Sequence, residues 1–191
     1  MKAQYLELSN YNRLFPYMKY ENALALRVAL ETGLRIDDVL SLTKDNIIDG
    51  YVVTVAEKTD KKGKWKISDH LYDELKNRPG KGYIFPKRKG MRGHRTRQAV
   101  YVDMKRALAR ADIEKNASPH SARKTFAVEL LKKAGDIKVV QKELQHSDSA
   151  TTALYAYADH EAAGNCYGCF MAALPQIARA IARAIIEEMS R

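Results

Sequence analysis

One stretch of this chain, residues 46–68, has the pattern of β-structure, whereas apolar residues elsewhere recur at helical spacing. Within it, Asp49-Gly50 lies between two runs rich in β-branched residues, a pairing that favours a two-residue hairpin turn. Residues 51–55 are then expected to form a strand, and a second turn at residues 59–63 returns the chain through Trp65 and Ile67. The sequence therefore predicts three short antiparallel strands.

The rest of the chain is expected to be helical. Residues 21–32 are apolar on nearly every side, which predicts a buried helix, and Gly33 is placed to end it in a left-handed conformation. A short helix should follow, with Asp37 and Asp38 in its first turn, where the helix dipole favours negative charge. Helical spacing also recurs in three later groups: Val100, Met104 and Leu108; Ala122, Phe126 and Leu130; Ile137, Val140 and Leu144. We expect a mainly α fold with a small three-stranded antiparallel sheet.

Length and composition favour one soluble domain. The chain has 191 residues, of which 46% are apolar and 29% charged, enough for a core and a solvated exterior. There is no apolar run of membrane-spanning length and no signal-peptide layout at the start, so we expect a cytoplasmic protein without a membrane partner. Cys166 and Cys169 have only His160 nearby, too few ligands for structural zinc, and are expected to be reduced thiols. No metal or other cofactor is predicted.

Positive charge is concentrated in the middle of the chain. The formal net charge is +10; residues 58–110 hold 17 Lys and Arg against 5 Asp and Glu, whereas residues 118–191 hold 9 against 8. A basic stretch raises the local density of polyanions, of which nucleic acid is the usual one. A solvated face is the alternative, and charge alone does not decide between the two.

The segment SPHSARKTFAVELL carries the first site-like arrangement. Ser118 is a suitable N-cap and Pro119 a suitable first helical residue, so His120 and Arg123 should share one face at the positive end of a helix. Backbone N–H groups, an imidazole and a guanidinium would then converge, as phosphate binding requires. The alternative is a capped amphipathic helix with two polar surface residues.

Four further positions complete a set in fixed order along the chain. Arg35 lies in TGLRIDDVLSL, Lys58 lies at the edge of the second turn of the β-region, and His146 precedes Tyr155 by nine residues. Together with HxxR, this order resembles the tyrosine recombinase, or phage integrase, family. Its typical pattern is an arginine box, a lysine in a β-turn, HxxR, and a histidine followed nine residues later by tyrosine. The resemblance extends from about residue 9 to residue 160.

The resemblance implies that Arg35 and Arg123 bind the non-bridging oxygens of the scissile phosphate. Tyr155 would attack phosphorus and form a 3′-phosphotyrosyl bond. These residue types suit the chemistry on general grounds, because a phosphodiester repels an oxygen nucleophile and gains charge in the transition state. Two guanidiniums can answer that charge bidentately, which lysine does poorly.

The remaining three residues would move protons or hold the phosphate. By resemblance, Lys58 protonates the departing 5′ oxygen, His120 assists proton movement at the nucleophile, and His146 hydrogen-bonds the phosphate. A tyrosine hydroxyl, with a reference pKa near 10, is a poor nucleophile at pH 7 unless its proton has an acceptor. Imidazole is the natural one.

Each residue also has an ordinary structural interpretation. Arg35 could pair with Asp37 or Asp38, and Tyr155 could be an aromatic core residue like most tyrosines. Tyr157 is a near competitor, but the nine-residue spacing selects Tyr155 as the nucleophile and leaves Tyr157 for packing.

Two positions depart from the family pattern. Gln145 stands where a glycine usually precedes the second histidine, and a left-handed conformation there costs a non-glycine residue about 1–2 kcal/mol. Asp38 stands where the family generally has glutamate, which shortens by one methylene its reach toward the arginine.

The basic region fits a DNA-binding role. Six cations precede the helix that contains Val100, in a segment expected to be a loop; we predict that they contact DNA: Lys87, Arg88, Lys89, Arg92, Arg95 and Arg97. Residues 175–191 form an amphipathic pattern after Pro175, which predicts a helix that packs within the chain or, as in similar recombinases, on a neighbouring protomer. We therefore expect a catalytic domain over residues 1–174 and a docking helix over 175–191. The N-terminal DNA-binding domain usual in the family is expected to be absent.

The sequence thus predicts a site-specific DNA recombinase that breaks and rejoins double-stranded DNA through a 3′-phosphotyrosyl intermediate, without metal or ATP. A tetramer on DNA and a monomer in free solution are expected. A type IB topoisomerase-like nicking and closing enzyme is one alternative. A non-catalytic DNA-binding module on the same scaffold is another.

Overall fold

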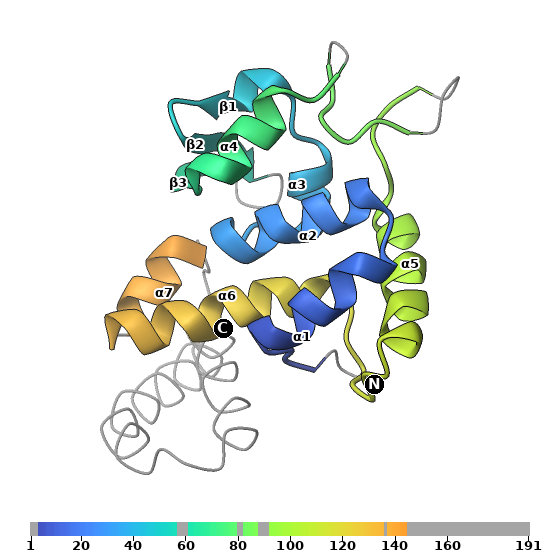
Figure 1. Ribbon diagram of the computed structural model, residues 1–191. Helices are drawn as coiled ribbons and strands as arrows, with labels where there is room; N and C mark the ends of the chain where they lie inside the picture. Colours follow the sequence, from blue (N-terminus) through green and yellow to red (C-terminus); the bar gives the residue numbers. More distant parts are fainter. Residues whose placement is uncertain (1–3, 57–60, 80–81, 88–91, 136, 145–191) are drawn as a thin grey trace, which may run out of the picture. The chain divides into compact units, whose positions relative to one another are not determined.

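A computed structural model describes residues 4–56, 61–79, 82–87, 92–135 and 137–144 (Figure 1). The chain divides into two compact units, residues 1–126 and residues 127–191, and each is described by itself. Over the described ranges, no helix is long and apolar enough to cross a lipid bilayer.

The first unit is mostly helical with one small sheet, which confirms the predicted fold class. In chain order its elements are α1 (Leu8–Leu14), the 3-10 turn η1 (Phe15–Tyr17), α2 (Tyr20–Thr32), α3 (Ile36–Leu40), η2 (Lys44–Asn46), β1 (Ile47–Ile48), β2 (Tyr51–Ala56), β3 (Lys61–Lys66), α4 (Asp69–Lys76), α5 (Arg97–Arg110) and the start of α6 (Pro119–Ala134).

The three strands pair antiparallel in the order β1-β2-β3, as the hairpin pattern predicted. The extent of the second turn was wrong: residues 61–63 pair with residues 54–56 and so belong to β3. Ile48 pairs with Tyr51 across the first turn. Asp49 and Gly50 both have positive φ, 48° and 80°, the conformation that an Asp-Gly hairpin turn requires. Trp65 pairs with Val52, and both are buried, so one face of the sheet joins the apolar core.

Helix α2 lies within the core of the first unit, as its nearly continuous apolar sequence predicted. Leu24, Leu26 and Val28 are among its buried residues. Its first turn is capped from another helix, because Asp103 Oδ2 on α5 accepts hydrogen bonds from the Lys19 backbone N–H (2.9 Å) and from Asn22 Nδ2 (2.6 Å). This buried carboxylate fixes α5 against the start of α2.

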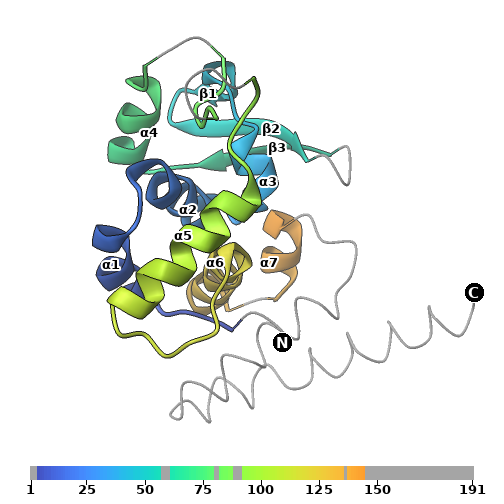
Figure 2. The same ribbon diagram turned by 90° about the vertical axis from the view of Figure 1, so that its right-hand side faces the viewer.

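Helix α5 contacts η1, α1, α2 and α3 (Figure 2). Val100, Met104 and Leu108 are buried on one side of it, as their spacing predicted. The expectation that Arg97 belongs to the preceding loop is wrong: Arg97 is the first helical residue. The Thr96 hydroxyl accepts the Ala99 N–H at 3.3 Å, so the helix begins one turn before its first buried residue.

The second unit is described over the end of α6 and α7 (Ile137–Leu144). Gly135 ends α6 with φ 65°, and its N–H donates to the Leu131 carbonyl at 2.8 Å. Val140 and Leu144 on α7 are buried, in line with the predicted helical spacing.

Candidate active site

The junction between α2 and α3 holds Arg35 in place. Gly33 adopts φ 68°, and its N–H donates to the Ala29 carbonyl, so α2 stops there. The Thr32 hydroxyl donates to the Val28 carbonyl (2.7 Å) and accepts the Leu34 N–H (3.2 Å). This compact turn makes the half-buried Arg35 the residue that precedes the first turn of α3.

The first turn of α6 is equally well fixed. Pro119 begins the helix, as predicted, and the Ser121 hydroxyl accepts the Ser118 N–H at 3.0 Å. The buried Thr125 hydroxyl lies 2.7 Å from the Leu6 carbonyl and 2.9 Å from the Ser121 carbonyl. These bonds tie the start of α6 to the N-terminal segment.

Arg123 joins the two motifs. Its side chain is 4% exposed, and its Nη1 donates a hydrogen bond to the backbone carbonyl of Gly33, 90 residues earlier. The arginine of HxxR is therefore bonded directly to the turn that presents Arg35.

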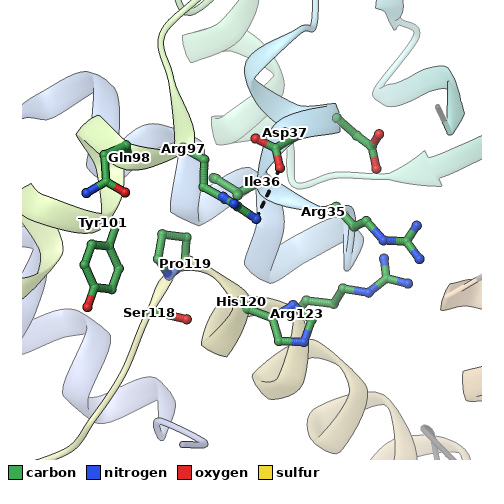
Figure 3. Close-up of a pocket in the computed structure, with 11 residues that line it drawn as sticks. Arg35, Ile36, Asp37, Arg97, Gln98, Tyr101, Ser118, Pro119, His120 and Arg123 are labelled. Atoms are coloured by element: carbon green, nitrogen blue, oxygen red, sulfur yellow. Dashed lines mark ion pairs between the residues drawn. The ribbon is translucent and has the colours of Figure 1, made fainter. Parts of the chain in front are cut away.

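A pocket of about 500 Å³ lies where these elements meet, entirely within the first unit. Figure 3 shows the guanidinium groups of Arg35 and Arg123 side by side, with the His120 ring next to Arg123. Two guanidiniums so placed repel each other, and an anion between them removes that repulsion. Since α6 also points its N-terminus here, the pocket favours a phosphate group.

His120 has an unusual pKa in this setting. Desolvation is the largest cause, followed by the positive charges of Lys124, Arg123, Arg35 and Arg97, and together they lower the pKa of His120 from 6.5 to about 4. His120 is also an exposed residue that lines the pocket. His120 is neutral at pH 7, with one ring nitrogen able to accept a proton.

The pocket also includes residues that the sequence did not single out as site residues. Gln98 and Tyr101, on the first turns of α5, line it together with Arg97. Arg97 Nη1 lies 3.8 Å from Asp37 Oδ2. Asp37 therefore pairs with Arg97. The alternative interpretation, in which Arg35 pairs with Asp37 or Asp38, is not supported, since within the described residues Arg35 forms no ion pair. Thr96, as a helix cap, was the signal that Arg97 starts a helix.

The described residues contain no group of three or more His, Cys, Asp or Glu side chains that could hold a metal ion. Three arginines, Arg35, Arg97 and Arg123, line the pocket against two carboxylates, Asp37 and Asp38, so the lining favours an anionic ligand.

Comparison with known proteins places these features in a family. The family model described as "Phage integrase family" matches residues 4–162, most of the chain. The chain belongs to the phage integrase family.

Curated members of the phage integrase family are similar to this chain over part of their length. "Tyrosine recombinase XerC" of Xanthomonas campestris pv. campestris (strain B100) is 32% identical over 143 residues, 71% of this chain and 44% of that protein. "Tyrosine recombinase XerD" of Lacticaseibacillus casei is 33% identical over 144 residues, 68% of this chain and 48% of that protein. The chain spans about half the length of the curated relatives it matches.

Solved structures share the fold. The catalytic domain of bacteriophage HP1 integrase matches with a TM-score of 0.64 at 24% identity, covering 87% of this chain and 97% of that one. A lambda integrase dimer bound to a COC′ core site matches with a TM-score of 0.67 at 21% identity, covering 82% of this chain and 48% of that one. Both are consistent with the mainly α fold and small sheet expected of the phage integrase family.

The structure brings together three of the six catalytic residues that the phage integrase resemblance predicted: Arg35, His120 and Arg123. The other three, Lys58, His146 and Tyr155, lie outside the described residues, as do Gln145 and the predicted helix over 175–191. Their roles remain predictions.

The predicted DNA-binding cations differ in their surroundings. Lys87 and Arg92 are described on either side of residues 88–91, and the Lys87 N–H donates to the Gly93 carbonyl at 3.1 Å. Arg95 is mostly buried and lies 3.7 Å from Glu21 on α2, so it anchors the loop to the helix. Arg88 and Lys89 are outside the described residues.

Proposed function

We propose that this chain is a site-specific DNA recombinase that breaks and rejoins double-stranded DNA through a 3′-phosphotyrosyl intermediate. The observation that carries the proposal is the pocket in which Arg35, from one motif, meets His120 and Arg123, from another some 85 residues away. Relatives named tyrosine recombinases support the same chemistry.

Arg35 and Arg123 are proposed to bind the two non-bridging oxygens of the scissile phosphate. Their guanidiniums offset the charge that repels a nucleophile, and they offset more as charge builds in the transition state. Arg123 is buried and bonded to the Gly33 carbonyl, so little reorganisation is needed when DNA binds.

The reaction proceeds by exchange of phosphate esters. The hydroxyl oxygen of Tyr155 attacks phosphorus, the bond from phosphorus to the 5′ oxygen breaks, and that oxygen takes a proton from Lys58. His120, neutral at pH 7, is proposed to accept or relay the tyrosine proton, and His146 to hydrogen-bond the phosphate. Attack by a 5′ hydroxyl of a second strand reverses these steps, so neither ATP nor a metal ion is required for the bond exchange.

The partners and domain roles follow from this proposal. Lys87, Arg88, Lys89, Arg92, Arg95 and Arg97 are proposed to contact the DNA or to support the loop that does. Residues 1–174 are proposed as the catalytic domain and residues 175–191 as a helix that docks on a neighbouring protomer. We expect a monomer in free solution, a tetramer on DNA, and action in the cytoplasm.

A nicked suicide duplex tests the chemistry. The full chain is incubated with duplexes from its source genome whose nick lets the cleaved fragment diffuse away, and a covalent protein–DNA adduct is sought on a denaturing gel. The adduct is expected with the native chain and with Tyr157→Phe, and is expected to be lost in Tyr155→Phe.

Two other outcomes would point elsewhere. Salt-sensitive DNA binding without any adduct indicates a binding module. Relaxation of supercoiled DNA that carries a single half-site, without strand exchange between two sites, indicates a nicking and closing enzyme.

A further inference from the structure

We propose that Arg97 is a third phosphate-binding cation of the pocket, and that Asp37 holds it until DNA binds and then gives it up to a backbone phosphate next to the scissile one. This inference rests on the proposed function and describes how the same site is regulated. Neither Arg97 nor Asp37 belongs to the six residues of the proposed reaction.

The two side chains come from helix starts on the rim of the pocket. Arg97 is the first residue of α5, fixed by the Thr96 cap, and Asp37 lies in the first turn of α3. Figure 3 shows the pair spanning the space between the two helices, with Arg35 and His120 beyond it. The unpaired backbone N–H groups in the first turn of α5 also favour an anion near Arg97.

The charge of Arg97 reaches the reacting end of the pocket. It is one of the four cations that lower the pKa of His120, together with Lys124, Arg123 and Arg35. A phosphate bound by Arg35 and Arg123 therefore lies within the field of Arg97 as well. The next phosphate along the strand is the natural partner for a cation one side chain further out.

The pair between Arg97 and Asp37 is weak enough to exchange. Its N–O distance is 3.8 Å, and the two side chains are 69% and 53% exposed. Pairs in such exposed positions contribute little to stability, because water screens them and both side chains lose freedom. A DNA phosphate accepts two guanidinium hydrogen bonds and also releases a counterion, so it competes well with the carboxylate.

Asp37 also affects the affinity of the pocket for DNA. A carboxylate on the rim of an anion-binding pocket repels DNA unless a cation covers it, and in the free protein Arg97 does so. Asp37 therefore weakens the binding of DNA whose backbone does not fully enter the pocket. Its removal is expected to strengthen binding.

The test is a double-mutant cycle on DNA binding by the full chain. Native protein, Arg97→Gln, Asp37→Asn and the double variant are titrated onto a fluorescein-labelled duplex of mixed sequence, and anisotropy is followed over a range of salt concentrations. Because both residues are exposed, the variants are expected to fold, which circular dichroism checks. Arg110→Gln, at the far end of α5, is the matched charge control.

The exchange predicts a definite pattern. Asp37→Asn binds about two- to fivefold more tightly. Arg97→Gln and the double variant both bind more weakly than native protein, and their plots of log affinity against log salt lose about one phosphate's slope, roughly 0.9. Arg110→Gln keeps the native slope.

A fixed ion pair that never contacts DNA predicts the opposite for the double variant. Removing both members then leaves the local charge unchanged, so the double variant matches native protein in affinity and slope, and the proposal is overturned. An equal loss of slope in Arg110→Gln overturns it too. Since these measurements need no covalent step, failure here with a Tyr155 adduct still forming leaves the proposed function standing.

Discussion

Two parts of the pocket hold their cations in different ways: the floor, formed by Arg35 and Arg123, and the rim, formed by Arg97 and Asp37. On the floor, Arg123 is 4% exposed and bonded to the Gly33 carbonyl. On the rim, Arg97 is 69% exposed and meets Asp37 at 3.8 Å. In the proposed function, the cation that meets the transition state is fixed before DNA arrives, whereas the cation that helps DNA enter can change partners.

Removing a floor cation should have the largest effect. Arg123→Ala is expected to slow adduct formation by about 10²- to 10³-fold, because a fixed charge is lost from the transition state. It should also lower the free energy of unfolding by about 1–3 kcal/mol, since the Gly33 carbonyl loses a buried hydrogen bond. Single-turnover adduct assays and urea denaturation measure the two effects.

Arg35→Ala is the matched comparison for this variant. It should slow the reaction to a similar extent while changing the free energy of unfolding by less than about 0.5 kcal/mol, because Arg35 is half-buried and forms no ion pair within the described residues. Equal losses of unfolding free energy in Arg35→Ala and Arg123→Ala would contradict the expectation that Arg123, bonded to Gly33, contributes more to stability than Arg35.

The turn that presents Arg35 can be strained without touching any charge. Gly33→Ala places a side chain at φ 68°, which should cost about 1–2 kcal/mol and displace Arg35, slowing adduct formation about tenfold to 100-fold. Gly135→Ala, at φ 65° and outside the pocket, is the control. It should lose similar stability and keep its rate; a rate loss as large as that of Gly33→Ala would show that destabilisation alone slows the enzyme.

Phosphate should raise the pKa of His120. In the free protein that pKa is about 4, and an anion bound beside the ring is expected to raise it by about 1–3 units. The ring protons of His120, followed by NMR against pH with and without inorganic phosphate, give both pKa values. An unchanged pKa in saturating phosphate would place the anion elsewhere.

The same shift sets a pH dependence of stability. The folded-state pKa lies below the ordinary value of 6.5, so the unfolded chain binds this proton more readily. The contribution of neutral His120 is present above pH 6.5 and is lost as the pH falls toward 4. In His120→Gln the urea midpoint should change less with pH over that range. A midpoint that depends on pH as it does in the native protein would count against the lowered pKa of His120.

Substitutions on the rim should have the smallest effect on the free energy of unfolding. Asp37→Asn and Arg97→Gln are each expected to change the free energy of unfolding by less than about 0.5 kcal/mol, because the pair is exposed. Urea denaturation of the two variants measures this. A loss above 1 kcal/mol in either would show that the pair is part of the scaffold, like Arg123 on the floor.

Local rules predicted much of the fold. Asp49-Gly50 gave the first hairpin turn, Gly33 the end of α2, and Pro119 the start of α6, because each depends on backbone preferences of neighbouring residues. The helix spacing of Val100, Met104 and Leu108 predicted which side of α5 is buried. The predicted start of α5 was wrong because the cluster of cations was interpreted as a loop up to Arg97, although Thr96 is a suitable helix cap.

The contacts between distant segments were beyond such rules. Nothing in the local sequence indicates that Asp103 caps α2, that Arg123 bonds Gly33, or that Arg97 pairs with Asp37. These contacts depend on how helices pack. The family resemblance predicted that Arg35, His120 and Arg123 act together, and the pocket brings them together, but it carried no information about the rim.

A duplex with a neutral methylphosphonate in place of the scissile phosphate tests most directly whether the floor arginines offset the charge of one phosphate. The adduct rates of Arg35→Ala and Arg123→Ala would be compared on this duplex and on the ordinary one. If the arginines act as proposed, both variants recover much of their lost rate once the phosphate charge is gone. If either is impaired equally on the two duplexes, that arginine serves some other purpose and the proposed pocket chemistry is wrong.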